Sequence, residues 1–494
     1  MNRIMTPCVR STSLSRTPMN PTSIRRILVN GWAAVVTTSL FCAAATHAAP
    51  SPADSSQGAA SPEVAFSPDS AAIGRILAAA QTNTHGLTRL AYLCDAYGAR
   101  PSGGTNLELA IDWALNELRK DGFSNVRGDA VQVPHWVRGE ESLELVSPVP
   151  RKMKVLGFGG TVATKAGGVT APLLVVKDLE DFALHTNEAR GRIVLYNRPY
   201  RDYGTDVRVR GQGGIAAAKA GAVGALLRSI TPLSLQTTHT GMTRNDTNTP
   251  AIPFAAVTVE DAEMLQRWWD RGVQPTVHLT LGAQQLPDAP SRNIIAEIPG
   301  TEHPEEVVVL SGHFDSWDVG QGAMDDGGGV MASWESLCII RDLGLKPRRT
   351  IRLVLWANEE FGLRGSKAYR DKYRDQLTNH VLAIESDSGV FKPTGFSFTG
   401  SEAASKWIRS ICGALEPVGA NKYKTGAGGA DLFALMEEGV PIMDLLVDGT
   451  KYFYYHHTEA DTPDKLDLTE FNQCLGAMAA MAFSVADAPT KLPR

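Results

Sequence analysis

Short apolar runs alternate with helical patterns along the second half of the chain, from Ser291 onward. Strands are expected at residues 307–310, 350–356, 381–385 and 440–447, and helices at 328–343, 366–376, 402–415 and 468–486. This alternation predicts an α/β fold, a three-layer sandwich with a mostly parallel central sheet. In such a sheet the reactive side chains lie in loops beyond the carboxyl ends of the strands.

Two helical patterns precede the first strands. The first runs from about residue 71 to residue 93, the second covers residues 106–120, and they flank a turn-rich connection, GARPSGG, at 98–104. Glycine and proline punctuate chains at such turns, so we expect helices on both sides of it. We assign residues 73–136 to the first part of the main domain and residues 289–494 to its second part.

The region between these parts, residues 137–288, has a different pattern. Short apolar runs such as 171–176 and 192–196 alternate with glycine and proline, which predicts a β-rich inserted domain. Its most regular piece, residues 215–227, is a run of small residues that predicts a closely packed helix.

A glycine motif stands just before that run. Gly211, Gly213 and Ala216 match the GxGxxA pattern of a dinucleotide-binding loop. The next acidic residue is Asp246, 35 positions beyond Gly211, whereas a ribose-binding acid is expected after about 20. We therefore interpret the motif as part of a helix and not as a cofactor site.

The first 48 residues have the layout of a secretory signal. Five arginines and no acidic residue precede an apolar stretch at about 27–45 and an alanine-rich cleavage zone, with cutting after Ala45 or Ala48. A membrane anchor is the alternative, but the stretch is short and broken by polar residues. Residues 49–72 are rich in proline, serine and alanine and predict a flexible lead or pro-segment. The sequence thus predicts a secreted or periplasmic protein with no stable membrane anchor.

Charge and cysteine content exclude other classes. The whole chain has 48 basic and 53 acidic residues, and without the five arginines of residues 1–48 the remainder has 43 against 53, a net charge of −10. A chain this acidic is a poor partner for nucleic acid. Cys94, Cys338, Cys412 and Cys474 are widely spaced, which excludes a cysteine zinc site but leaves one or two disulfides open.

The segment 311–329, SGHFDSWDVGQGAMDDGGG, gathers several potential metal ligands. Imidazole is a good zinc ligand, and in the HxD pair a carboxylate from Asp315 can hold the second ring nitrogen of His313. Asp325 and Asp326 follow in a glycine-rich loop, where a carboxylate can bridge two cations. Either pair alone is a weak signal, but together they indicate a metal site.

Further acids and a late histidine follow the next strands. Glu359 and Glu360 stand beyond the strand expected at 350–356, and one could ligate a metal while the other acts as general base. Asp387 follows the strand at 381–385, and His457 belongs to a histidine pair near the end of the chain. We expect these side chains to converge at one edge of the sheet.

Four blocks carry a resemblance to a known family. The segments 311–329, 353–366 (LVLWANEEFGLRGS), 384–389 (IESDSG) and 455–462 (YHHTEADT) resemble those of the co-catalytic zinc exopeptidases, and most of all the carboxypeptidase Q (plasma glutamate carboxypeptidase) family. The resemblance extends to VPHWVRGEES at 133–142 and FTGSE at 398–402, and so covers most of the chain after about residue 75.

Several residue roles are implied by this resemblance. Asp325 would bridge two Zn²⁺ ions, one also held by His313 and Asp387 and the other by Glu360 and His457, with Glu359 as general base. Asp315 would support His313, Asp326 would help position the bridge, and the peptide bond between Asp325 and Asp326 would be cis. His457 is preferred to His456 because it stands four residues before Asp461, the spacing of the family's HxxxD pattern.

The family also implies the activity. We expect a secreted dizinc exopeptidase acting on dipeptides or short peptides, with a protease-associated domain at 137–288 and a homodimeric assembly. A broader-range aminopeptidase and a single-zinc glutaminyl cyclase are the alternatives, and the site chemistry leaves the direction of attack open. Tyr423 is a candidate for stabilising the oxyanion, while Lys422, Lys424 and Arg364 are candidates for meeting a substrate carboxylate.

Overall fold

The computed structural model describes residues 66–426 and 428–494, and residues Val64–Arg494 form one compact unit. The predicted signal at 1–48 and most of the lead at 49–72 lie outside the described residues. The end of that lead is helical, because α1 (Ser70–Gln81) begins after Asp69, whose side chain accepts from the amides of Ala71 and Ala72. No described helix is both long and apolar enough to span a bilayer.

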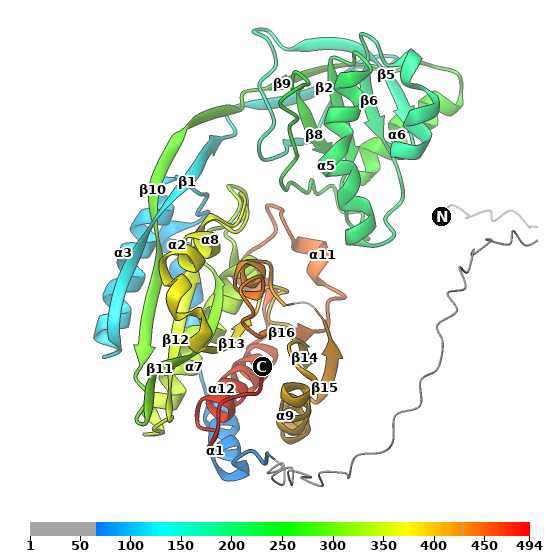
Figure 1. The fold of residues 1–494 in the computed structure, drawn as a ribbon. Helices are drawn as coiled ribbons and strands as arrows, with labels where there is room; N and C mark the ends of the chain where they lie inside the picture. Colours follow the sequence, from blue (N-terminus) through cyan, green and yellow to red (C-terminus); the bar gives the residue numbers. More distant parts are fainter. Residues whose placement is uncertain (1–65, 427) are drawn as a thin grey trace, which may run out of the picture. The chain divides into compact units, whose positions relative to one another are not determined.

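An eight-stranded sheet forms the centre of the main domain (Figure 1). Its strands, in spatial order, are β1 (Ser124–Val137), β10 (Gln284–Ile298), β12 (Arg349–Trp356), β11 (His303–His313), β13 (His380–Glu385), β16 (Ile442–Val447), β14 (Pro393–Thr399) and β15 (Lys422–Thr425). The central strands β12, β11, β13 and β16 are parallel. β14 and β15 at one edge are also parallel. Antiparallel pairing of β1 with β10, of β10 with β12 and of β14 with β16 makes the sheet mixed.

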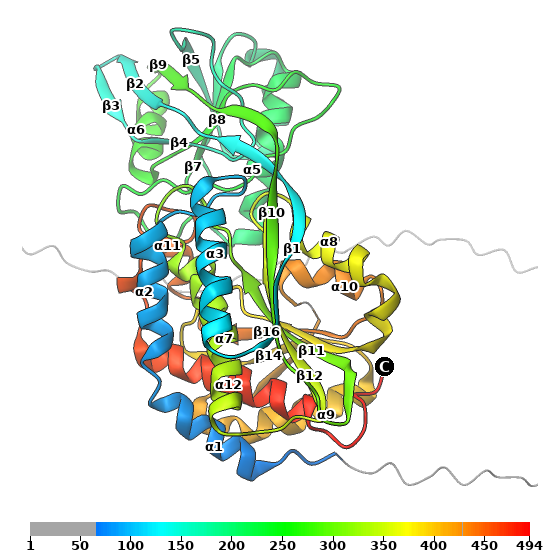
Figure 2. The same cartoon turned by 90° about the vertical axis from the view of Figure 1, so that its left-hand side faces the viewer.

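Helices cover both faces of this sheet, as the three-layer prediction requires (Figure 2). One face packs against α1, α2 (His85–Tyr97), α3 (Thr105–Lys120), α7 (Gly328–Asp342), α9 (Glu402–Ala414) and α12 (Leu468–Ala486). The other packs against α8 (Arg364–Tyr373) and α10 (Phe433–Met436). Successive strand residues point to opposite faces, so Leu310 joins the first layer and Val309 the second.

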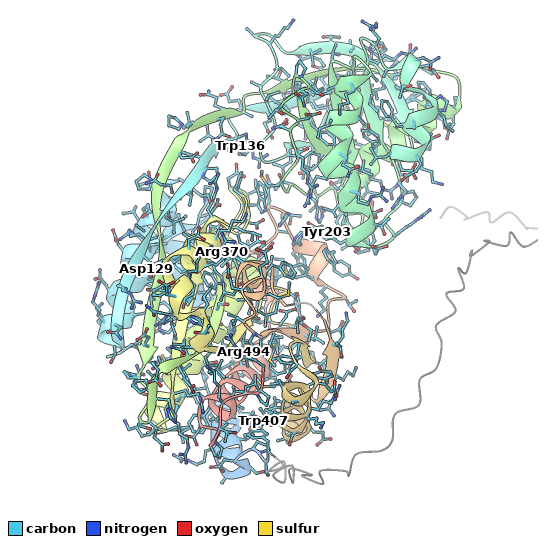
Figure 3. The ribbon with its side chains drawn as sticks, viewed as in Figure 1. Asp129, Trp136, Tyr203, Arg370, Trp407 and Arg494 are labelled. Atoms are coloured by element: carbon cyan, nitrogen blue, oxygen red, sulfur yellow. The ribbon has the colours of Figure 1, made fainter. Side chains whose placement is uncertain are left out.

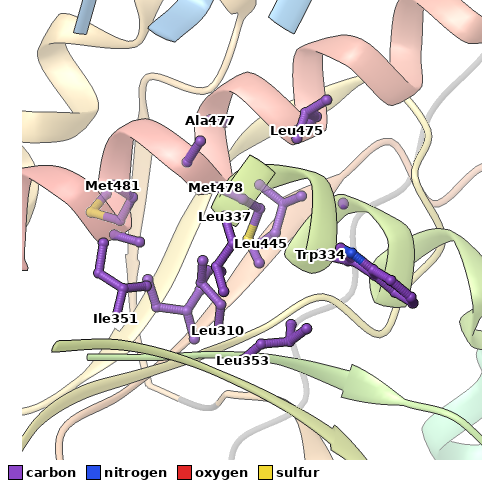
Figure 4. Close-up of a cluster of buried hydrophobic side chains, with 14 of the residues drawn as sticks. Leu310, Trp334, Leu337, Ile351, Leu353, Leu445, Leu475, Ala477, Met478 and Met481 are labelled. Carbon is purple, nitrogen blue, oxygen red and sulfur yellow. The ribbon is translucent and has the colours of Figure 1, made fainter. Parts of the chain in front are cut away.

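Leucine and methionine side chains fill the first layer. Figure 4 shows Leu310 and Leu353 of the sheet facing Leu337 of α7 and Met478 of α12. All four are fully buried. Full burial of one such side chain stabilises the fold by roughly 1.5–3 kcal/mol, so this layer holds the strands that carry the site.

Residues between β1 and β10 form a second eight-stranded sheet. Its strands are β3 (Arg151–Met153), β2 (Glu141–Ser147), β9 (Thr276–Leu281), β5 (Val169–Val176), β6 (Ile193–Tyr196), β7 (Gly224–Arg228), β8 (Phe254–Val257) and β4 (Val155–Gly157), in spatial order. It also has helices α4 (Leu179–Leu184), α5 (Tyr203–Lys219) and α6 (Val259–Asp270), so the insert is α/β and the β-rich description was incomplete. The long strands β1 and β10 pair antiparallel up to Val137 and Gln284, where the insert begins and ends.

Two helix predictions were wrong in extent. The pattern from about 71 to 93 is two helices, because Asn83 interrupts it and its side chain accepts from the amide of Gly86 at the start of α2. The run at 215–227 is the end of α5 followed by β7, because Gly221 adopts φ of +83° just after the helix. Alanine and glycine carry no amphipathic pattern, so the change from helix to strand could not be predicted.

The glycine motif lies in a helix, and the four described cysteines are buried. Gly211, Gly213 and Ala216 lie inside α5, in agreement with the interpretation as a helix. Within the described residues, Cys94, Cys338, Cys412 and Cys474 are buried and free, so the disulfides left open by the sequence do not form there.

Candidate metal centre

Five elements bring the expected ligands to one edge of the main sheet. His313 is the last residue of β11, which runs three residues further than expected, so this histidine ends its strand and does not follow it. Glu359 and Glu360 follow β12, and Asp387 follows β13. Asp325 lies in the short helical turn η2 (Ala323–Gly327), and His457 follows α11 (Tyr452–Tyr455).

Asp325 lies between the two histidines. Its Oδ1 is 3.1 Å from Nε2 of His313, and its Oδ2 is 3.2 Å from Nε2 of His457. His313 Nε2 is also 3.4 Å from Oδ1 of Asp387, and His457 Nε2 is 3.2 Å from Oε2 of Glu360. One carboxylate thus joins two groups, each completed by a histidine and an acid.

The second nitrogen of each histidine ring faces a main-chain carbonyl. Nδ1 of His313 is 3.0 Å from the oxygen of Asp315, and Nδ1 of His457 is 3.3 Å from the oxygen of Thr240. An N–H at Nδ1 that donates to a carbonyl leaves the lone pair at Nε2 free for a metal. Both rings therefore present the ligating atom toward Asp325.

His456 lies close to this group but differs from His457. Its Nε2 is 3.6 Å from Oδ2 of Asp325, and its ring stacks on His457 with centroids 3.5 Å apart. In the described part of the chain its ring nitrogens have no carbonyl partner, whereas its own carbonyl oxygen is 2.9 Å from Nδ1 of His239. His457 contacts two carboxylates and His456 only one, so the geometry favours His457 as the ligand.

Asp315 supports the site in a way the sequence did not indicate. Its carboxylate accepts from the Glu359 amide at 3.0 Å and from Oγ of Ser102 at 3.2 Å. The same carboxylate is 3.8 Å from Nδ1 of His313, so its main-chain carbonyl and not its side chain orients that ring. The carboxylate instead fixes the backbone of Glu359.

Two further acids hold the loop of the bridging residue. Asp326 accepts from the amide of His313 at 3.0 Å, and the peptide bond between Asp325 and Asp326 is cis, as predicted. Asp461 accepts from the amides of Ala323, Met324 and Asp325 at 3.1, 2.6 and 3.2 Å. Asp461 entered the sequence argument only through its spacing from His457.

Arg100 is a supporting residue that sequence reasoning missed. It is fully buried, and its guanidinium donates to the carbonyls of Phe314, Gly98, Gln321 and Gly322. The only sign in the sequence was its place in the GARPSGG turn.

Burial and crowding shift the titration of the site. Burial alone would lower the pKa of His313, but Asp387 and Asp325 hold it well above its ordinary value. Burial raises the pKa of Glu359 well above its usual range, and the charges of Asp387 and Glu360 raise it further. So many carboxylates in one buried place require positive charge among them.

The donor set fits zinc. Among the described residues, Oδ2 of Asp325 and Oε1 of Glu360 are buried and accept no hydrogen bond. Unpaired buried carboxylate oxygens are costly, and a metal ion satisfies them. Three groupings have ligand atoms within 4.8 Å of one another: Asp325 with His456 and His457, His313 with Asp325 and Asp387, and His313 with Glu359 and Glu360. Histidine and carboxylate ligands of this kind suit Zn²⁺.

A cavity of about 650 Å³ opens over these residues. Its lining includes Asp325, Glu359, Glu360, Asp387 and His457, together with side chains of the insert. This volume is in the range of small-molecule sites.

The remaining candidates do not line this cavity. The hydroxyl of Tyr423 donates to Oγ of Ser405 at 2.9 Å, away from the metal ligands. Lys422, Lys424 and Arg364 are also absent from the lining. The structure therefore does not support these residues as contacts of the reacting peptide.

Comparison with known proteins assigns the family. A model of peptidase family M28 matches residues 293–482, which contain every metal-ligand candidate. Together with the 44% identity to the relative named next, this match shows that the chain belongs to this family and is a peptidase. Carboxypeptidase Q of Mus musculus is 44% identical over 406 residues, covering 82% of this chain and 86% of that protein. Carboxypeptidase Q of Homo sapiens is 43% identical over the same shares.

Solved structures have the same fold. The peptidase M28 precursor of Shewanella amazonensis aligns with a TM-score of 0.82 at 32% identity, over 86% of this chain and 98% of its own. A zinc aminopeptidase of Bacillus subtilis aligns with a TM-score of 0.62 at 21% identity, over 83% and 98%. The second likeness shows the fold alone.

Proposed function

We propose that this chain is a dinuclear zinc exopeptidase that hydrolyses dipeptides or short peptides. The observation that carries the proposal is the position of Asp325, with one oxygen toward His313 and the other toward His457. His313 and Asp387 would hold one ion and Glu360 and His457 the other, with Asp325 between them. When bound, zinc supplies Lewis acidity, which lowers the pKa of water and favours negative charge on the scissile carbonyl oxygen.

Glu359 is the proposed general base. Its backbone is fixed by Asp315, and its side chain lines the cavity. The carboxylate takes a proton from the attacking water, whose oxygen bonds to the carbonyl carbon. As the C–N bond breaks, Glu359 returns this proton to the leaving amine nitrogen, so the proton balance closes.

We also propose where the protein is exported, a role for the insert and an oligomeric state. The layout of residues 1–48 supports export to the periplasm or the exterior. The second sheet between β1 and β10 supports a protease-associated role for residues 137–288. The resemblance to carboxypeptidase Q supports a homodimer.

A broader-range aminopeptidase is the second candidate. Leucine aminopeptidase 2 of Trichophyton tonsurans is 28% identical over 303 residues, covering 60% of this chain and 56% of that protein. Its name favours attack from the amino end, whereas the name carboxypeptidase Q favours the carboxyl end. A panel of free, N-acetylated and C-amidated dipeptides separates the two directions.

Substitution of Glu359 tests the chemistry itself. Glu359→Gln keeps the size of the side chain but cannot take the proton, so we expect turnover of a free dipeptide to fall by about 10²–10⁴ with zinc content unchanged. The matched control is Glu416→Gln, since Glu416 is exposed and remote from the cavity. Near wild-type turnover in Glu359→Gln would sink the assignment of the base.

A further inference from the structure

The insert contributes one wall of the catalytic cavity. Tyr203, Arg210 and Arg244 lie on this wall, and the carboxylates of the metal centre line the same cavity. Figure 3 labels Tyr203 at the end of the insert beside α11. Its ring stacks on Phe453 at 4.8 Å and meets His456 edge-on at 4.9 Å, so this wall touches the histidine pair.

Arg210 is a buried cation without an anion. It is only 7% exposed, and its guanidinium lies 5.4 Å from the Tyr203 ring centroid. Nη1 donates to the carbonyl of Thr240 at 3.1 Å and Nη2 to the hydroxyl of Tyr203 at 2.8 Å, while Nε has no partner. In the described ranges no carboxylate lies within 4.0 Å of its nitrogens.

The contrast with Arg100 shows what Arg210 lacks. Arg100 is also buried without an acid, but four carbonyls accept from it. Arg210 has two acceptors for five N–H donors. A buried charge with unused donors is costly unless a ligand completes it. Because Arg210 lines the cavity, that ligand is an anion inside it.

Arg244 adds a second guanidinium to the lining of the cavity. It is exposed, and across residues 66–426 and 428–494 it forms no hydrogen bond or ion pair. Its Cδ lies 3.8 Å from the point that a Cβ of Gly211 would occupy, so its stem lies against α5 at the residue that follows Arg210. Guanidinium groups with unused donors suit the planar, bidentate geometry of a carboxylate.

The cavity carries charges of both signs. Its lining holds the acids Glu359, Glu360 and Asp387 together with Arg210 and Arg244. Arg210 lies close to the metal ligands, because its Nη1 and Nδ1 of His457 both face the carbonyl oxygen of Thr240. A fully extended dipeptide spans only about 7 Å, so a scissile bond at the metal ligands leaves the terminal carboxylate within reach of the insert.

We propose that Arg210 and Arg244 bind the free α-carboxylate of the residue that leaves, so that the insert selects dipeptides and short peptides with an unblocked carboxyl end. The inference rests on the proposed peptidase function and names its direction. The insert is then a specificity element of the same cavity.

Binding to an inactive variant tests this directly. Zinc-loaded Glu359→Gln is titrated calorimetrically with alanyl-leucine, with its C-terminal amide and with N-acetyl-alanyl-leucine. Charge-assisted hydrogen bonds to a carboxylate lead us to expect about 10–100-fold tighter binding of the free acid than of the amide. The N-acetyl dipeptide retains the carboxylate and should keep its dependence on the two arginines.

Substitutions then assign the effect. In the Glu359→Gln background, Arg210→Met and Arg244→Gln should each weaken binding of the acid about 10-fold and change binding of the amide less than about twofold. The matched control is Arg208→Gln, on the same helix but exposed and outside the cavity, and it should change neither. Since Arg210→Met could fail to fold, exposed Arg244 carries the test independently.

Failure of this inference is distinct from failure of the proposed function. Equal affinity for acid and amide, equal losses in the variants or no detectable binding of the acid would each overturn the carboxylate site. Absence of peptide hydrolysis by the zinc-loaded wild type would instead overturn the peptidase proposal, whatever the calorimetry shows.

Discussion

Replacement of Arg100 tests how the site is held together. The guanidinium donates to four carbonyls at 2.7–3.1 Å, three of them in the loop between β11 and η2. The amide of Ser316 in that loop also donates to the Arg100 carbonyl at 3.1 Å. This loop carries Asp315, which holds the Glu359 amide, and Trp317, whose Nε1 donates to Glu360 at 2.5 Å.

The expected magnitude follows from these contacts. At about 1.5 kcal/mol for each hydrogen bond from a charged donor, four bonds contribute roughly 6 kcal/mol. Methionine no longer buries a charge, which offsets part of this, so Arg100→Met should lower the free energy of unfolding by about 4 kcal/mol. Arg100→Lys keeps the charge but concentrates three donors on one atom, and we expect a loss of about 2 kcal/mol.

The assay is urea unfolding of the zinc-loaded protein followed by tryptophan fluorescence, with the zinc dissociation constant measured in parallel. Arg119→Met is the control, since Arg119 is an exposed residue of α3 and its loss should matter by less than about 0.5 kcal/mol. A free energy of unfolding of Arg100→Met within about 1 kcal/mol of the wild type would show that the four bonds contribute little to stability.

Three other predictions address the ligands, the core and a buried histidine. His457→Ala should lower zinc content per chain while His456→Ala does not, and the reverse result would show that the wrong histidine was chosen. Leu310→Ala, in the core of Figure 4, should destabilise by about 2–5 kcal/mol in urea, and a smaller loss would mean that the layer repacks. Burial, and after it the charge of Arg352, lower the pKa of His380 to about 4, so the folded protein holds this ring in its neutral form. The unfolded chain takes up a proton at about pH 6.5, so the free energy of unfolding falls as the pH drops from about 6.5 toward 4. Between pH 7 and 5 the free energy of unfolding should fall by about 2 kcal/mol through His380, and His380→Gln should remove this loss in urea unfolding at the two pH values. An identical pH dependence in the wild type and in His380→Gln would contradict the role of His380.

Much of the main domain was predictable because its pattern is strong. The apolar runs at 350–356 and 381–385 are fully buried strands, and their own composition is enough to predict them. Parallel strands place their carboxyl ends together, so convergence of His313, Glu359 and Asp387 followed from order along the chain.

Contacts between distant segments were not predictable. Arg100 is held by carbonyls more than 200 residues away, and no local pattern specifies such a partner. The approach of Tyr203 and Arg210 to the histidine pair likewise depends on the tertiary position of α5. In the insert, the end of α5 and the start of β7 could not be predicted, because alanine and glycine show no periodic pattern of buried and exposed positions.

In the proposed function, Asp325 joins two zinc ions in one hydrolytic site. The most direct test removes metal with a chelator and returns zinc in steps while bound zinc and hydrolysis of a free dipeptide are measured on the same sample. We predict two zinc ions per chain and full activity only when both are bound. Full activity with one ion per chain, or with none, would show that hydrolysis does not need a pair of ions joined by Asp325.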